Sequence, residues 1–124
     1  MKNQTGYIAI TSVLVIAAIV LIIGTSVLLL AVNDIQSALS NKKSDESLDL
    51  VESCVEDALL RLNEDNSIPA TITLPDGSCS VTINSQVGTL WTFTVSGTFI
   101  SHAKSIQVVA DRTNTVTVNS WTQL

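Results

Sequence analysis

The chain opens with a long unbroken run of apolar residues. From Tyr7 to Val32 only threonine, serine and glycine interrupt the aliphatic side chains. A bilayer core needs about 20 such residues in helical form, so residues 7–32 predict one membrane-spanning helix. The run is longer than the apolar region of a signal peptide, about 7 to 15 residues, and no small-residue cleavage motif follows it before Asn33. We therefore expect this segment to be retained as an anchor.

The apolar run passes into a segment with the period of an amphipathic helix. Residues 33–64 contain neither proline nor glycine, so the sequence does not force a break there. Ser44 can begin a fresh helix after a brief loosening at Ser40–Lys43, and the sequence leaves open whether the helix is continuous. Apolar residues recur at spacings of three and four, with acids on the other face, and they are Leu48, Val51, Val55, Ala58, Leu59 and Leu62. We expect residues 33–64 to form a helical stalk.

Residues 65–124 change to a period of two, which predicts a β domain. Pro75-Asp76-Gly77 carries the residue types of a tight turn, and Ser101–Lys104 and Arg112–Asn114 are expected as hairpin loops. The predicted strands are rich in valine, isoleucine, threonine and aromatic residues, and they are Thr71–Leu74, Cys79–Asn84, Leu90–Ile100, Ser105–Ala110 and Thr115–Trp121. The clearest alternation puts one set of residues on a buried face, namely Trp91, Phe93, Val95, Gly97 and Phe99.

The expected fold class is therefore α+β. A long N-terminal helix, transmembrane and then stalk, packs on a small antiparallel sheet of four or five strands. The helix residues expected against the apolar face of the sheet are Val51, Val55, Ala58 and Leu62.

The two cysteines, Cys54 and Cys79, add a covalent constraint. An even pair in a small exported domain usually forms a disulfide, whereas a metal site needs more ligands than two thiols and one histidine. Closing this loop would stabilise the domain by about 3 kcal/mol in the chain-entropy model. We expect a structural bond that pins helix to sheet. It favours an extracytoplasmic C-terminal domain, which the distribution of lysines on the two sides of the anchor does not settle.

The charges and the search for reactive residues exclude several function classes. Nine of the eleven acidic residues lie between Asp34 and Asp65, and the net charge is −5. Without a basic patch, no nucleic-acid partner is expected, and the acidic run is most simply a solvated helix face. His102, expected in a hairpin tip, has no second histidine or carboxylate pair nearby. With no phosphate loop or nucleophile elbow either, we expect no catalysis, no metal and no cofactor.

The N-terminus resembles a prepilin of the type IV filament superfamily. The opening MKNQTG before YIAITSVLVIAAIVLIIG is similar to a short polar leader that ends in glycine and is removed by a prepilin peptidase. The resemblance implies a leader at residues 1–6, cleavage between Gly6 and Tyr7, and methylation of the freed amine. It covers about the first 30 residues as a motif and roughly the first 64 as architecture.

One position departs from the pattern of that family. Most members carry a glutamate as the fifth residue of the mature chain, where it is thought to pair with a neighbouring subunit's N-terminal amine, but this chain has Thr11. Threonine cannot supply that charge. Some minor subunits proposed for filament tips also lack the glutamate, so the resemblance implies a minor subunit. Within the same assembly helix, Gly24 is either a point of close packing or unwinding, or an ordinary membrane-helix glycine.

The resemblance implies a minor pilin or pseudopilin, a structural subunit of a type IV pilus-like or type II secretion-like filament. Its implied partners are other pilin-like subunits, the prepilin peptidase, an inner-membrane assembly platform and membrane lipid. It would be a single-pass membrane protein before it joins a cell-surface filament. The alternative is a signal-anchored extracytoplasmic domain that senses or binds a ligand and does not assemble. Trp121 remains open as a core aromatic or a contact with a neighbouring subunit.

Overall fold

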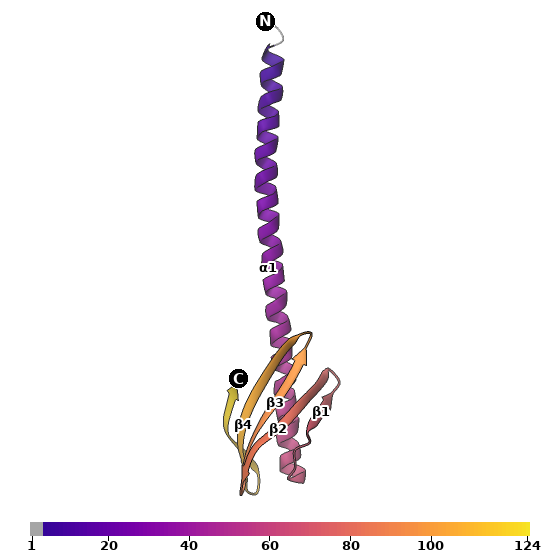
Figure 1. Cartoon of the computed structure of the whole chain (residues 1–124), viewed down its shortest axis with the longest axis vertical. Coiled ribbons are helices and arrows are strands. Elements are labelled where there is room, and N and C mark those ends of the chain that lie inside the picture. The colour runs from indigo at the N-terminus through magenta and orange to yellow at the C-terminus, as the bar shows by residue number, and fades with distance from the viewer. Residues whose placement is uncertain (1–3) are drawn as a thin grey trace. The chain divides into compact units, whose positions relative to one another are not determined.

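The computed structural model describes residues 4–124, as one helix followed by five strands (Figure 1). This is the α+β fold class that the sequence predicts. The chain divides into two units, residues up to Leu39 and Ser40–Leu124, and each is described by itself. The elements are α1 Gln4–Asp65, β1 Thr71–Leu74, β2 Gly77–Val87, β3 Leu90–Phe99, β4 His102–Arg112 and β5 Val116–Gln123.

The first unit is the apolar part of α1. This helix is long and apolar enough to cross a membrane, and its apolar window is not buried within the protein. Large aliphatic side chains such as Leu14, Leu21 and Leu28 are all more than 60% exposed. Because water would solvate such a surface poorly, the helix is compatible with a single-pass membrane anchor. The helical backbone also continues through Ser40–Lys43, so the loosening that the sequence left open is absent.

The second unit is a five-stranded antiparallel meander with one face against the C-terminal part of α1 (Figure 1). Phe93 on the central strand β3 is fully buried, and its neighbours along β3 alternate between buried and partly exposed as predicted. The helix stripe expected to face the sheet is fully buried, and it consists of Val51, Val55, Ala58 and Leu62. The predicted packing of helix on sheet is therefore confirmed.

Two strand ends differ from the prediction by three residues, and the other strand bounds differ by two residues or fewer. The loop expected at Ser101–Lys104 is a two-residue turn at Ile100 and Ser101, whose φ values are 43° and 64°. A hairpin turn with two positive φ values matches the twist of the flanking strands, so it closes tightly. As a result β4 begins at His102, three residues earlier than expected. Likewise β2 continues past Asn84 to Val87 before a turn at Gly88, whose φ is 61°.

Gly97 on β3 lies where the helix comes closest to the sheet. A Cβ at this position would lie 2.9 Å from Val51 Cγ2 and 3.3 Å from Cys79 Sγ. We expect Gly97→Ala to lower the free energy of unfolding by about 1 to 3 kcal/mol, because the extra methyl group overpacks the core. The change would be measured as a lower urea midpoint. Gly24→Ala is the matched control, because nothing lies within 4 Å of a Cβ there. Equal midpoints for both variants would contradict the close packing at Gly97.

Candidate functional site

The predicted cleavage site lies at the start of α1. Gly6 and Tyr7 are in the first turns of the helix, whereas residues 1–3 of the predicted leader lie outside the described residues. A Cβ on Gly6 would meet nothing within 4 Å, and its backbone does not need the left-handed conformation. The fold of this chain therefore does not require glycine at position 6. A substitution by alanine here can test processing without disturbing packing.

The threonine and serine hydroxyl groups within residues 7–32 bond to backbone carbonyls of the helix itself. Thr11 Oγ1 donates to Tyr7 O at 2.9 Å, and Ser12 Oγ donates to Ala9 O at 2.9 Å. The second pair, Thr25 and Ser26, bonds to backbone carbonyls one turn earlier in the same way. Unpaired polar groups are costly in hydrocarbon, so these internal bonds make the segment suitable for a lipid or helix-bundle environment. Gly24 lies between the two pairs with open space around it and does not break the helix.

The expected disulfide joins Cys54 on α1 to Cys79 on β2, with the two Cα atoms 6.3 Å apart. Both cysteines are buried in the core between helix and sheet. They are the only cysteines of the chain, so no thiol remains for redox or metal chemistry. The bond is structural, because it fixes the distance between α1 and the sheet.

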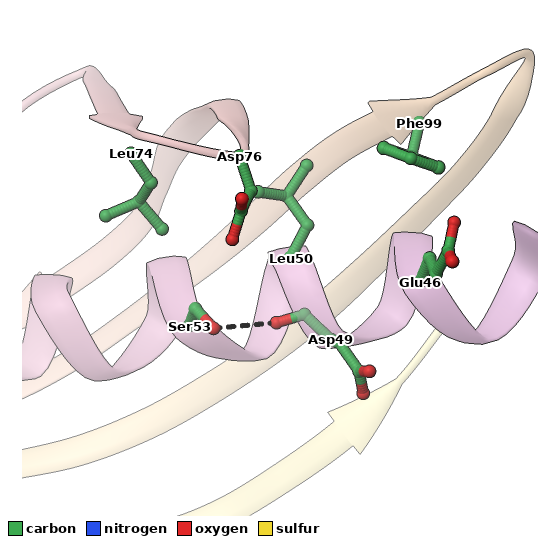
Figure 2. Close-up of a pocket in the computed structure, with 7 residues that line it drawn as sticks. All are labelled: Glu46, Asp49, Leu50, Ser53, Leu74, Asp76 and Phe99. Atoms are coloured by element: carbon green, nitrogen blue, oxygen red, sulfur yellow. Dashed lines mark hydrogen bonds between the residues drawn. The ribbon is translucent and has the colours of Figure 1, made fainter.

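A pocket of about 360 Å³ lies between α1 and the β1–β2 turn (Figure 2). Leu50, Leu74 and Phe99 form its apolar part, and three carboxylates stand around it. Figure 2 shows the carboxylate of Asp49 turned away from that of Asp76, so the acids do not converge on one point. Within residues 4–124 no group of three or more acidic, histidine or cysteine side chains is placed to hold a metal ion. The pocket therefore has an apolar part and an acidic rim.

His102 is not in a hairpin tip, which corrects the prediction. It is the first residue of β4, is paired with Phe99 and is partly buried. Its Nδ1 lies 3.1 Å from Ile100 O and its Nε2 lies 3.4 Å from Ser40 Oγ, while Ser47 Oγ donates to its carbonyl oxygen at 2.8 Å. The error arose because the turn is shorter than the expected loop. These contacts tie the β3–β4 turn to α1.

Arg112 has a structural role that the sequence did not reveal. It was expected in a loop, but it is the last residue of β4, and its side chain reaches the end of α1. Its Nε donates to Leu62 O at 2.7 Å, and its Nη2 donates to Asn63 O at 3.2 Å. The last carbonyl groups of a helix lack intrahelical partners and carry partial negative charge. A guanidinium at this end donates hydrogen bonds to these carbonyls, and its positive charge interacts favourably with their negative charge. Asn66 follows with a φ of 53° and donates its N–H to Leu62 O, which closes the helix.

The described residues thus show an apolar helix whose threonine and serine hydroxyls bond to its own backbone, and a helix-on-sheet unit closed by a disulfide. Comparison with protein-family models, with curated proteins and with solved structures gives no significant match.

Proposed function

We propose that this chain is a minor, tip-type pilin or pseudopilin, a structural subunit of a type IV pilus-like or type II secretion-like filament. The observation that carries the proposal is the glycine–tyrosine junction in the first turns of a helix with exposed aliphatic side chains, whose threonine and serine hydroxyls bond to its own backbone. A prepilin peptidase would cut at that junction. The same apolar surface would hold the subunit in the membrane first and pack against other subunits later.

The absence of charge in the assembly helix supports a minor role. The hydroxyl of Thr11 already donates to the backbone within its own turn, with Tyr7 O and Ile8 O as the acceptors within reach. It therefore offers no negative charge for pairing with the terminal amine of a neighbour. A subunit without that pair is better suited to the tip, where no subunit has to dock beyond it, than to a repeating shaft.

The test is the mature N-terminus. We expect the chain extracted from its native membrane or from sheared filaments to begin at Tyr7 and to carry a methylated amine, and Gly6→Ala to retain residues 1–6. Intact mass and N-terminal sequencing would measure both. Gly24→Ala is the matched control, because it changes a glycine of the same helix away from the junction, and we expect it to be processed normally.

The opposite outcome selects the alternative function. A native chain that keeps its leader, or that is cut elsewhere, is not a prepilin peptidase substrate. The protein would then be better described as a signal-anchored extracytoplasmic domain that binds or senses a ligand.

A further inference from the structure

The two edges of the sheet are protected unequally. The β1 edge is only four residues long, and Pro69 and Pro75 lie close to its two ends. The β5 edge has eight residues with neither proline nor charge, and residues 117–124 are all exposed. Natural sheets usually blunt an open edge with short strands, prolines or charged side chains, because an unpaired row of backbone groups attracts another strand. The β5 edge, at the yellow end of the chain in Figure 1, has none of these features.

The register shows which backbone groups face this open edge. Leu124 N donates to Ser105 O at 2.9 Å, next to the pair Gln123 and Ile106. In an antiparallel ladder, alternate residues turn both backbone groups toward the same neighbour. Ser120 and Thr122 therefore bond to β4. Trp121 and Gln123 present their N–H and C=O groups outward, where an added strand would find them.

The same strand carries exposed apolar side chains on the inner face of the sheet. Val118 pairs with Ala110 and Trp121 pairs with Val108, and both partners on β4 are fully buried. Cross-strand partners share a face, yet Val118 and Trp121 are 42% and 41% exposed. The helix therefore leaves β5 beyond Val116 largely uncovered.

Between α1 and β5 lies a groove of about 430 Å³. Leu59 and Leu60 line the helix side, and Val116 and Val118 line the strand side. An extended chain beside β5 would place every second side chain into or beside this groove. The groove therefore favours large apolar side chains at alternate positions of the incoming strand.

The charge at the groove indicates which kind of strand fits. Glu56 borders it and has no ion-pair partner in the described part of the chain, since Arg61 pairs with Asp57 at 2.8 Å and Arg112 bonds to the end of α1. A second copy of this chain would bring no cation on its own β5, because residues 113–124 contain no lysine or arginine. A strand from another protein can supply that cation.

From these observations we propose that the β5 edge and its groove form a docking site for an extended strand of a partner protein, added to the sheet as a sixth strand. The partner strand carries large apolar side chains at alternate positions and a lysine or arginine that faces Glu56. Backbone pairing supplies the binding, and the groove and Glu56 select the side chains. This site goes beyond the proposed filament function and does not depend on N-terminal processing.

The full chain in detergent micelles can be tested with fluorescein-labelled nine-residue peptides in which valine and leucine alternate with threonine. The three peptides differ at one position on the apolar face, which is lysine, glutamine or glutamate. Methyl groups on the backbone nitrogens along one edge of each peptide keep the peptides from pairing with each other. We expect saturable binding, with the lysine peptide about two- to fivefold tighter than the glutamine peptide, in keeping with one exposed ion pair. Glu56→Gln should remove that difference. A lysine peptide methylated on both edges should not bind.

Hydrogen exchange and edge variants locate the site. Bound peptide should slow exchange at the amides of Trp121 and Gln123, while those of Ser120 and Thr122 are already protected by β4. Val118→Lys should abolish binding without a change in urea midpoint, because Val118 is an exposed edge residue. Thr73→Lys on the β1 edge is the matched control and should bind normally. The proposal is overturned if no peptide of the series binds, if protection appears at β1, or if the chain alone dimerises through β5 in sedimentation experiments, which would assign the edge to a second copy.

Discussion

Replacing both cysteines, Cys54→Ala together with Cys79→Ala, is expected to lower the free energy of unfolding of Ser40–Leu124 by about 3 kcal/mol. The bond closes a loop of sequence separation 25, and without it the unfolded chain regains the freedom that this closure removes. One kcal/mol corresponds to about 4 to 8 °C for a domain of this size. The melting temperature should therefore fall by about 12 to 24 °C. Near-ultraviolet circular dichroism of the full chain in detergent would follow the transition, since Trp91 is buried in the core.

Two controls distinguish the effect of losing the disulfide from the effect of changing nearby side chains. Ser53→Ala changes an exposed neighbour on the same helix, whose hydroxyl bonds only to Asp49 O, and should melt close to the wild type. Wild-type protein that has been reduced and alkylated after brief unfolding should show about the same loss as the double variant. If the double variant melts with the wild type, the disulfide contributes nothing to stability and its role is elsewhere.

Periodicity predicted most of this fold, since the C-terminal part of α1 and strands β1 to β4 each have an apolar face against the same core. The change from three-and-four spacing to alternation marks the end of the helix within a few residues, and the stripe around Val55 is buried as expected. β2 was predicted to end at Asn84. The structure has a register shift between Ile83 and Ser85, so the strand continues with its faces exchanged. A bulge of this kind interrupts a period without ending a strand.

The tight turn between β3 and β4 could not be predicted from periodicity. Positive φ values are usually supplied by glycine or asparagine, but here Ile100 and Ser101 adopt them. The pairing of the two flanking strands over their full length imposes this conformation, and no residue type in the turn indicates it. His102 was misplaced for that reason alone.

The contacts of the candidate site also fall into those that the sequence predicts and those that only the structure shows. The disulfide followed from the even number of cysteines in a small domain for which export was expected. Arg112 at the end of α1 and Ser47 bonded to the His102 carbonyl join residues about 50 positions apart, which only the tertiary structure brings together. The open edge at β5 likewise needed the strand order, because an edge strand and a central strand of the same composition look alike in sequence.

The two units are stabilised in different ways. The aliphatic side chains of the first unit are exposed, as is compatible with a helix that an apolar medium surrounds. The second unit has its own core of buried residues and a covalent bond within it. Substitutions in one unit should therefore leave the other unchanged, which is why full-length protein in detergent can report on the second unit alone.

The largest loss from a single side chain is expected at Phe93, on the central strand. Its ring is fully buried in the core formed by α1 and the sheet, where it pairs across the sheet with Ile83 and Val108. Phe93→Ala removes that ring and leaves a cavity that the surrounding strands can fill only in part. We expect the free energy of unfolding to fall by about 3 to 5 kcal/mol, seen as a lower urea midpoint with an unchanged slope.

The chain offers a matched control for this variant, because Phe99 is its only other phenylalanine and lies six residues further along the same strand. Phe99 is partly exposed at the rim of the acid-edged pocket, so its ring loses fewer contacts when it is removed. Phe99→Ala should therefore cost clearly less than Phe93→Ala. Equal losses would mean that the helix does not press on the middle of β3 as the buried positions indicate. A much larger loss at Phe99 would move the centre of the core toward the β3–β4 turn, where the contacts of Ser47 and His102 would then carry more of the stability.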